Sequence, residues 1–257
     1  MVQVVAEGER VNARETMLQR GMVRLGVVCP MANEGDDAVR FSRAVVDKCQ
    51  GFESVIFFAV FDRVTTDNSL NHMRALELGE PRLCVVWAPE GRTVVDAYLR
   101  GYTEALRADC DWILEIDAGF SHQPADIPQF FEAMEQGADC VFGSRFLGAF
   151  KDSSRMRRFV SWGGTKLANL LLGTQQTDMT SGFELFSRPA LEAVLARGIH
   201  SRAHFFQTEI KTYCRNLHMV EVPITYRAAS PGLGWRALAD AFRQLGRLFV
   251  LRLKGQL

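Results

Sequence analysis

Polar side chains follow four apolar runs in the first half of the chain, each at the point where the run ends. Asn33 and Glu34 follow Val23–Cys29, Asp62 follows Ser54–Val60, Glu90 and Arg92 follow Leu83–Trp87, and Asp117 follows Trp112–Ile116. Short runs rich in β-branched and aromatic residues predict buried strands. Ligands bind beyond the carboxyl ends of strands in open parallel sheets, so these side chains are expected at one edge. Carboxylates beside a cation suit a nucleotide and its diphosphate.

Asp117 is the first candidate for chemistry. It stands at the tip of an apolar strand, and the residues after it, Ala118 and Gly119, are small. Its carboxylate can therefore reach a metal ion or a ribose without obstruction. The alternative is a turn cap, since Asp commonly occupies turns. Its place after the fourth of four strands favours the functional interpretation.

The elements that must position these residues alternate between strand and helix. Helical spacing of apolar residues predicts helices at Asp37–Cys49, Asn68–Leu78 and Thr93–Leu106. This alternation predicts an α/β protein with a mostly parallel sheet flanked by helices. Beyond Asp117 we expect helices at Ile127–Glu135, Phe159–Leu172, Pro189–Ala196 and Ala203–Asn216, and strands at Asp139–Phe142, Phe183–Phe186 and Met219–Tyr226.

Composition narrows the class of protein. The 257 residues are 47% apolar, and 30 Lys and Arg balance 30 Asp and Glu. This balance argues against a nucleic-acid-binding protein with a broadly basic surface, because phosphate binding needs surplus cations. The six cysteines are scattered, which predicts neither a zinc site nor a disulfide framework. No signal-peptide pattern or membrane-length apolar run is present, so we expect a cytoplasmic protein, soluble or held at a membrane surface.

Eight segments in sequence order resemble those of family 2 glycosyltransferases of the GT-A fold, and within them the dolichol- or polyprenyl-phosphate mannose synthases. The resemblance runs from about Val23 to about Gly234. The segments are VVCPMANE (Val27–Glu34), FDRVTTDNS (Phe61–Ser69), EGRTVVDAYLRGY (Glu90–Tyr102), ILEIDAGFSHQP (Ile113–Pro124), VFGSRF (Val141–Phe146), DMTSGFELFSR (Asp178–Arg188), FFQTEI (Phe205–Ile210) and EVPITYR (Glu221–Arg227). It implies the Rossmann-like fold of nucleotide-diphospho-sugar transferases.

The resemblance also implies a donor site. Pro30, Asn33 and Glu34 would line the nucleotide pocket, Asp62 would recognise the base, Arg92 would lie near the diphosphate, and Asp117 would be the first carboxylate of the metal-binding DxD motif. The departing diphosphate gathers negative charge, which a divalent ion (Mg²⁺ or Mn²⁺) or clustered cations stabilise.

Three arginines are candidates for phosphate contacts on the donor or on a lipid-phosphate acceptor. They are Arg145, Arg157 and Arg158, because Arg is suited to bidentate phosphate binding. Arg145 is the preferred one, and a solvated basic face is the alternative for the other two.

An acidic residue near the acceptor is expected from the QTE segment. A base is needed only where the acceptor is a hydroxyl or an amine. Glu209 is the first choice, with Gln207 beside it on the acceptor side and Asp178 as second choice. An exposed helix charge is the alternative for Glu209, and a turn-stabilising role is the alternative for His122.

The chain departs from the family at several site positions. Gly119 stands where the second Asp of DxD is expected and offers no ligand. Either Asp117 holds the metal with the diphosphate and water, or the enzyme works without tightly bound metal, or activity is lost. Ala32, Arg63 and Glu184 also replace the family's Tyr, Asp and Arg, at the donor pocket and the acceptor side.

The sequence divides into three parts. We expect a helical leader over 1–22, a GT-A domain over 23–234 (nucleotide half 23–119, acceptor half 120–234) and a basic amphipathic helix over 235–257. In that helix Leu238, Phe242, Leu245 and Phe249 form an apolar stripe, with Arg236, Arg243, Arg247 and Lys254 on the other side. Such a helix suits an anionic membrane surface. The alternative is packing on the domain or on a second subunit.

The predicted function is transfer of a hexose, mannose-like, from a GDP or UDP donor with inversion, which the resemblance implies. The acceptor would be a polyprenyl or dolichyl phosphate, or a small hydroxyl-bearing molecule. A catalytically silent relative that binds nucleotide-sugars or proteins is the alternative, raised by Gly119. The expected partners include a membrane surface and a second copy of the chain, but no nucleic acid.

Overall fold

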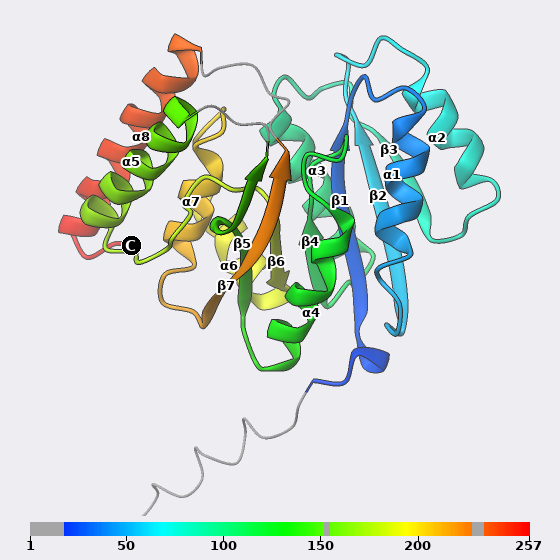
Figure 1. Cartoon of the computed structure of the whole chain (residues 1–257), viewed down its shortest axis with the longest axis horizontal. Coiled ribbons are helices and arrows are strands. Elements are labelled where there is room, and N and C mark those ends of the chain that lie inside the picture. Colours follow the sequence, from blue (N-terminus) through cyan, green and yellow to red (C-terminus); the bar gives the residue numbers. More distant parts are fainter. Residues whose placement is uncertain (1–17, 152–154, 228–233) are drawn as a thin grey trace, which may run out of the picture.

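One seven-stranded sheet forms the centre of the molecule (Figure 1). The computed structural model describes residues 18–151, 155–227 and 234–257, without the side chains of 150–157. The strands lie in the order β3-β2-β1-β4-β6-β5-β7. They are β1 Arg24–Met31, β2 Ser54–Phe61, β3 Leu83–Trp87, β4 Trp112–Glu115, β5 Cys140–Lys151, β6 Glu184–Ser187 and β7 Met219–Arg227.

The first four strands are parallel, and β6 reverses the direction. β1 lies between β2 and β4, whereas β6 is antiparallel to both β4 and β5, and β7 is parallel to β5. The strand expected to stop at Cys29 continues through Pro30 to Met31. Proline is tolerated there because β4 pairs with β1 only up to Val28, so Pro30 lies beyond the doubly paired stretch.

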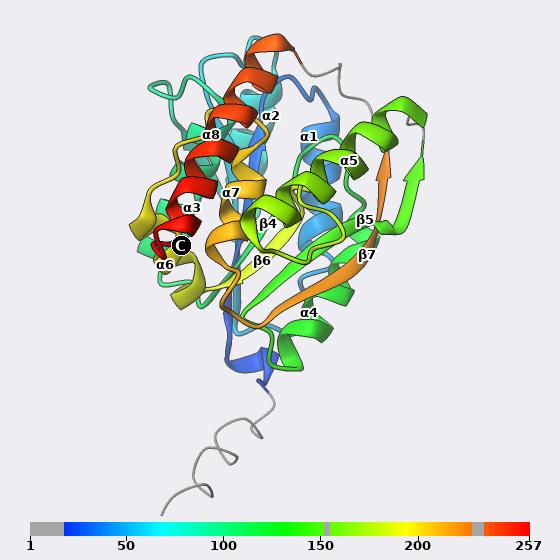
Figure 2. The ribbon, with the colours of Figure 1, turned by 90° about the vertical axis from the view of Figure 1, so that its left-hand side faces the viewer.

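Helices cover both faces of the sheet (Figure 2). Buried side chains of α1, α2 and α4 form one core, and those of α3, α6 and α7 form the other. The described helices are η1 Arg20–Met22, α1 Asp37–Val46, α2 Ser69–Glu77, α3 Val94–Arg107, η2 Pro124–Asp126, α4 Ile127–Glu135, α5 Arg155–Leu172, α6 Arg188–Arg197, α7 Phe206–Tyr213 and α8 Trp235–Leu253.

Most expected elements are confirmed, and β3 and α4 begin and end at the expected residues. Thr93 is the N-cap of α3 rather than its first residue, because its side chain and that of Asp96 form a capping box. The expected strand end at Phe142 is wrong, since β5 runs to Lys151. Gly148 interrupts the apolar pattern by which a strand is recognised in the sequence. In the structure it lets the backbone of β5 lie against Ile224 of β7, where a Cβ atom would not fit.

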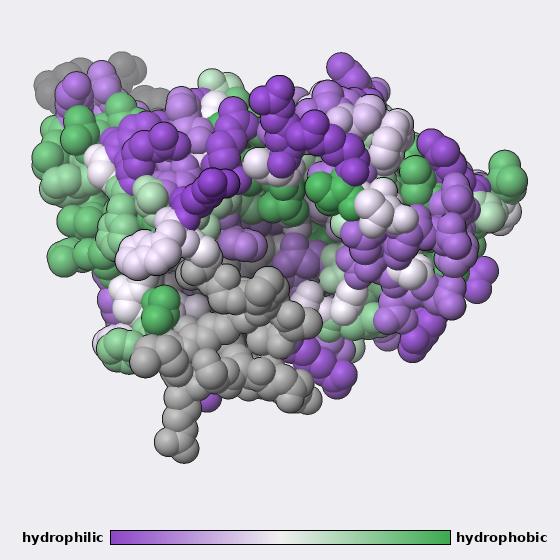
Figure 3. Space-filling view, turned by 90° about the horizontal axis from the view of Figure 1, so that it is seen from above, coloured by the Kyte–Doolittle hydropathy of each residue, from purple (hydrophilic) through white to green (hydrophobic). Residues whose placement is uncertain are grey.

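α5 and α8 pack side by side at one flank of the sheet (Figure 1). Leu172 on α5 meets Leu245 and Leu248 on α8, and Arg252 donates to the carbonyls of residues 170 and 171 at 3.0 and 2.9 Å. The apolar stripe of α8 is divided between the two expected environments. Leu245 is buried in the cluster with Leu172, whereas Phe242 is 60% exposed. Apolar side chains gather on this flank, at the left of Figure 3.

None of the described helices is both long enough and apolar enough to cross a membrane. Of the expected leader, residues 1–17 lie outside the described part, and residues 20–22 form a single 3₁₀ turn. The side chain of Arg20 pairs with Glu135 at 2.9 Å. The division of the chain into leader, two halves and terminal helix stays a prediction.

Two glutamates lie opposite each other inside the sheet. Glu115 of β4 and Glu184 of β6 are register partners, and both are fully buried. Lys211 of α7, also fully buried, donates to Glu184 at 2.6 Å and to the carbonyl of Ser181 at 2.6 Å. Gln207 and Tyr102 donate to Glu115. This buried ion pair attaches α7 to the sheet.

Lys211→Met leaves Glu184 buried without its cation, so we expect a loss of about 3 kcal/mol or more in unfolding free energy at pH 8. Burial raises the pKa of Glu184 from 4.5 to about 7, although Lys211 opposes the rise. Toward pH 5 the carboxyl is protonated in the folded state and needs no cation, so the loss should shrink. Urea unfolding at both pH values measures it.

The double variant Lys211→Met/Glu184→Gln should recover most of the stability at pH 8, because no charge is then left unpaired. An equal loss at the two pH values, or no recovery in the double variant, would contradict the assignment of this pair.

Candidate active site

Asp117 lies at the open edge of the sheet, two residues past the end of β4. Its side chain is 43% exposed, so a ligand can reach it. The hydroxyl of Tyr98, on α3, donates to its Oδ1. Nδ1 of His122 lies 3.6 Å from its Oδ2 and accepts from its backbone N–H at 3.4 Å. The carboxylate is therefore oriented from two sides while one part of it stays open.

His122 is buried and stabilises the turn after β4 instead of facing solvent. It is 1% exposed, and its ring lies 5.2 Å from those of Phe183 and Tyr226. Burial lowers the pKa of His122, and the charge of Asp117 opposes that shift. The histidine is thus an acceptor for the turn, as its alternative interpretation expected.

The turn after Asp117 has an unusual backbone. Gly119 and Phe120 both adopt left-handed conformations, with φ of +75° and +58°. The Phe120 ring packs edge-on against Phe41 of α1 at 5.1 Å, which holds this conformation in place. A Cβ atom at Gly119 would stand 2.7 Å from Oε2 of Glu34. The glycine therefore leaves room for the carboxylate of Glu34.

Asn33 fixes the loop that follows β2. Its Oδ1 accepts from the backbone N–H groups of Thr66 (2.8 Å) and Asp67 (3.1 Å), and its Nδ2 donates to the carbonyl of Val64 at 3.1 Å. Ser69 Oγ accepts from the N–H groups of Glu34 and Gly35 at 2.9 and 2.8 Å. The loops after β1 and β2 are thus held together.

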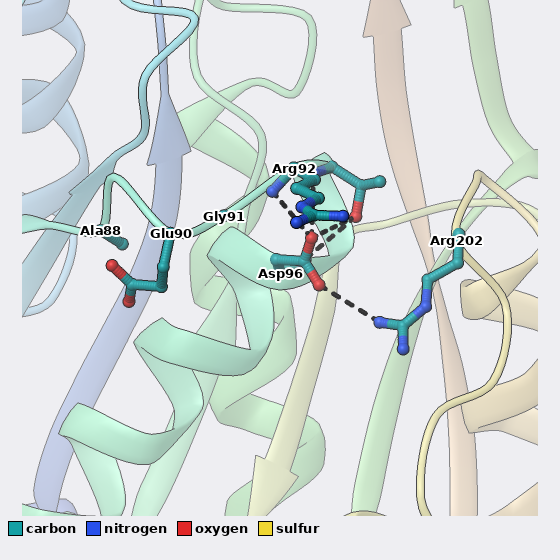
Figure 4. Close-up of a pocket in the computed structure, with 7 residues that line it drawn as sticks. Ala88, Glu90, Gly91, Arg92, Asp96 and Arg202 are labelled. Carbon is teal, nitrogen blue, oxygen red and sulfur yellow. Dashed lines mark hydrogen bonds and ion pairs between the residues drawn. The ribbon is translucent and has the colours of Figure 1, made fainter.

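A pocket of about 490 Å³ opens beside this edge (Figure 4). Asp96 lies at its centre and accepts from the backbone N–H of Arg92 at 2.9 Å and from Arg202 at 3.2 Å. Asp62, at the end of β2, is buried, and its Cβ would lie 3.6 Å from a Cβ atom at Gly91. Gly91, the residue before Arg92, therefore lies against Asp62. The lining residues are Ala88, Glu90, Gly91, Arg92, Thr93, Asp96 and Arg202.

Arg145 is not an open phosphate ligand, because it is 7% exposed and bound to Asp178. Its Nε and Nη2 each donate to that carboxylate at 2.7 Å, and Nη2 also donates to Thr180 at 2.5 Å. Burial alone would raise the pKa of Asp178, but the adjacent guanidinium outweighs it, and the pKa lies below the ordinary range. The guanidinium lies 5.4 Å from the Tyr226 ring centroid.

Glu209 lies fully buried on α7, and its partners come from outside the Asp117 edge. Its carboxylate accepts from Arg247 of α8, from the hydroxyl of Tyr213 at 2.9 Å and from the backbone N–H of Ser201 at 2.9 Å. The expectations of an exposed helix charge, and of Arg247 on the free side of α8, are therefore wrong. These bonds occupy the lone pairs that a general base would need.

The remaining acceptor-side candidates are dispersed. Gln207 is 4% exposed on α7 and reaches Glu115 rather than the surface. Arg158 is exposed on α5, and Arg157 lies in the same helix with its side chain outside the described part. The structure thus places Asn33 and Glu34 beside the loops after β2 and β4, whereas these acceptor-side candidates lie apart.

Sequence reasoning missed several residues of the site. Tyr98 orients Asp117, and Arg202 orients Asp96. Below them, inside the sheet, lie the buried residues Glu115, Glu184 and Lys211, which we call the buried charge cluster. Tyr98 looked like one more apolar residue of a helix face. The signal that was available is a charge inside an apolar strand, Glu115 in WILEI. Within the described residues, no group of three or more His, Cys, Asp or Glu side chains could hold a metal ion.

Comparison with solved structures supports the fold. A crystal structure of glucosyl-3-phosphoglycerate synthase from Mycobacterium tuberculosis, in complex with Mn²⁺, UDP and phosphoglyceric acid, superposes with a TM-score of 0.61 at 16% identity. The match covers 90% of this chain and 78% of that one. The same enzyme with Mg²⁺ and UDP gives 0.62. The chain therefore has the GT-A fold, as expected.

Two curated relatives resemble the chain in sequence. An undecaprenyl-phosphate mannosyltransferase of Micrococcus luteus is 34% identical over 134 residues, which span 51% of this chain and 55% of that protein. A polyprenol monophosphomannose synthase of Mycolicibacterium smegmatis is 26% identical over 235 residues, 90% of this chain and 87% of that one. The model of glycosyl transferase family 2 matches residues 27–195, and the chain belongs to this family of glycosyltransferases.

Proposed function

We propose that the protein transfers a hexose, mannose-like, from a nucleotide-diphosphate donor to a polyprenyl phosphate. The observation that carries the proposal is the open carboxylate of Asp117 at the carboxyl edge of the sheet, where the pocket lined by Arg92 and Asp96 also opens. Both curated relatives are named for mannose transfer to a lipid phosphate, which supports the sugar and the acceptor. A solved enzyme of the same fold binds UDP. The base of the donor is left open between guanine and uracil, so GDP and UDP are both to be tested.

The donor side is acidic, and a diphosphate needs a cation there. Mg²⁺ and Mn²⁺ use one or two carboxylates together with substrate phosphates, and Asp117 would supply a carboxylate beside the donor diphosphate and water. Bound there, the ion would neutralise the charge that gathers on the leaving diphosphate. Asp117 is held in orientation by Tyr98, and Asn33 holds the loop that carries Asp62.

The acceptor side favours a phosphate over a hydroxyl. A hydroxyl acceptor needs a base, but Glu209 is occupied by Arg247, Tyr213 and backbone donors, and Asp178 is occupied by Arg145. A phosphate monoester is already an anionic nucleophile and needs no base. Its oxygen would attack the anomeric carbon while the bond from that carbon to the diphosphate breaks, which inverts the configuration.

An apolar face on α5 and α8 suits a lipid-borne acceptor. Phe159, Trp162 and Leu170 of α5 are 65, 48 and 75% exposed, and Trp235 and Phe242 of α8 are 85 and 60% exposed. The two helices pack together, so these side chains form one surface. The exposed cations beside them are Lys166, Arg236, Arg243 and Lys254. Exposed aromatic residues flanked by cations are typical of helices that lie on anionic bilayers. We infer that this face meets a membrane surface.

Calorimetric titration with GDP and UDP, each with and without Mn²⁺, tests the donor site. One nucleotide should bind, and Mn²⁺ should tighten its binding about tenfold or more, since a cation neutralises the diphosphate beside Asp117. Asp117→Ala should lose the effect of Mn²⁺. Asp47→Ala, which removes an exposed carboxylate at the far end of α1, is the matched control and should bind as the wild type does.

The acceptor is tested with radiolabelled GDP-mannose and UDP-glucose and with a polyprenyl phosphate. Label should pass into the lipid phase. Transfer only to a small hydroxyl acceptor would contradict the proposal. Nucleotide binding without any transfer would favour a silent relative.

Sedimentation with vesicles of phosphatidylcholine and phosphatidylglycerol tests the α5–α8 face. Leu170→Glu/Phe242→Glu should lower the bound fraction of protein about tenfold or more, because each side chain buries a large apolar area in the bilayer. The control is Leu78→Glu, which changes an apolar side chain that is 92% exposed at the C-cap of α2. Equal binding of the double variant and the control would exclude this face.

A further inference from the structure

We propose that Glu34 supplies the carboxylate that the chain lacks at Gly119, so that Glu34 and Asp117 together hold the donor's divalent cation. The inference rests on the proposed donor site and names a ligand that the DxD pattern does not contain.

The contact between Glu34 and Gly119 carries the inference. A Cβ atom at position 119 would stand 2.7 Å from Oε2 of Glu34 and 3.7 Å from its Cδ. The first of these distances is shorter than real Cβ contacts allow. The carboxylate of Glu34 thus occupies the space where any side chain at 119 would begin. A side chain at 119 would therefore require the carboxylate of Glu34, the end of a flexible side chain, to shift from this position.

Both partners of this contact are held in place. The backbone N–H groups of Glu34 and Gly35 share Ser69 Oγ as acceptor, at 2.9 and 2.8 Å, just before α1 begins. On the other side, Phe120 packs on Phe41, and the left-handed φ of +75° at Gly119 suits glycine. The backbones that carry Glu34 and Gly119 are therefore fixed by contacts outside the site.

Glu34 has acidic neighbours but no basic partner among the described residues. Glu34 is half-buried, and the carboxylates of Asp67, Asp37 and Asp117 lie around it. Asp37 is paired with Arg40 at 2.6 Å, and Asp67 accepts from the N–H groups of Gly35 and Ser69 at 2.9 Å each. Among the described residues, no Lys, Arg or His side chain makes an ion pair with Glu34.

The chemistry of the pair fits a hard divalent ion. Mg²⁺ and Mn²⁺ prefer oxygen ligands, and Mg²⁺ sites at nucleotides commonly use one or two carboxylates, phosphate oxygens and water. Asp117 offers the part of its carboxylate that Tyr98 and His122 leave open. Glu34, half-buried at the end of the neighbouring loop, offers the second. Two carboxylates in the loops after the adjacent strands β1 and β4 would thus replace two in the loop after one strand.

Electron paramagnetic resonance of Mn²⁺, titrated into the full chain with GDP or UDP present, tests the inference without any need for turnover. Glu34→Gln should weaken Mn²⁺ binding about tenfold or more, since it removes one charged ligand. Asp37→Asn removes a neighbouring charge that is already paired with Arg40, and it should change the affinity less than twofold.

Gly119→Ala is the second variant, because it leaves Glu34 intact but places a methyl group in its position. It should weaken Mn²⁺ binding in the same direction. Gly137→Ala controls for the cost of an alanine at positive φ, since Gly137 has φ of +88° and open space around a Cβ atom. Thermal unfolding of each variant shows that the chain is folded.

Mn²⁺ binding by Glu34→Gln at wild-type affinity, or no Mn²⁺ binding by the wild type, would overturn the inference. The proposed function fails separately, by absence of sugar transfer to polyprenyl phosphate in a wild type that binds Mn²⁺.

Discussion

The reversal of strand direction between β4 and β6 sets the strongest constraint on this structure. It puts Glu115 opposite Glu184 in a dry interior, where two negative charges cannot both persist. Burial, and then the charge of Glu184, hold the pKa of Glu115 well above its ordinary range, while Lys211 neutralises Glu184. Since α7 provides Lys211, this helix must lie against β4 and β6. Asp117 then emerges two residues beyond Glu115, above the buried charge cluster, in which every charge is compensated.

The edge above these buried charges differs, because no described Lys or Arg side chain makes an ion pair with Asp117 or Glu34. Arg145, the nearest buried guanidinium on the acceptor half, is bound to Asp178 in a bidentate pair. His122 is buried and its pKa is lowered, so it adds no lasting charge beside Asp117. The proposed cation would offset the repulsion between these carboxylates and an anionic donor. The paired charges that stabilise the fold thus lie inside the sheet, whereas the carboxylates of Asp117 and Glu34, which have no described Lys or Arg partner, lie at the edge where the ligand is expected.

The sequence predicts those features that depend on local pattern. Apolar runs identify the strands, and the polar residue after each run identifies the edge at which Asp62, Arg92 and Asp117 follow β2, β3 and β4. Their shared role in a donor site stays a prediction. Partners far apart in the chain leave no such signal. Arg145 meets Asp178, and Glu209 meets Arg247 from the terminal helix, so two candidates that looked free are occupied. The resemblance to family 2 carried the GT-A fold, but it could not show that Glu34 fills the space beside Gly119.

A net charge of zero conceals a separation of charge along the molecule. Glu34, Asp37, Asp67 and Asp117 gather at the loops that follow the strands, whereas α8 carries Arg236, Arg243 and Lys254 on exposed positions. An anionic bilayer would repel the first region and attract the second, which orients the molecule with α5 and α8 against the lipid. α8 begins near the level of the carboxyl edge of the sheet (Figure 1). A phosphate at the membrane surface could then approach the donor from the side of α5 and α8, while the nucleotide enters from water. The same charge separation would account for both an acidic donor site and a lipid-borne acceptor.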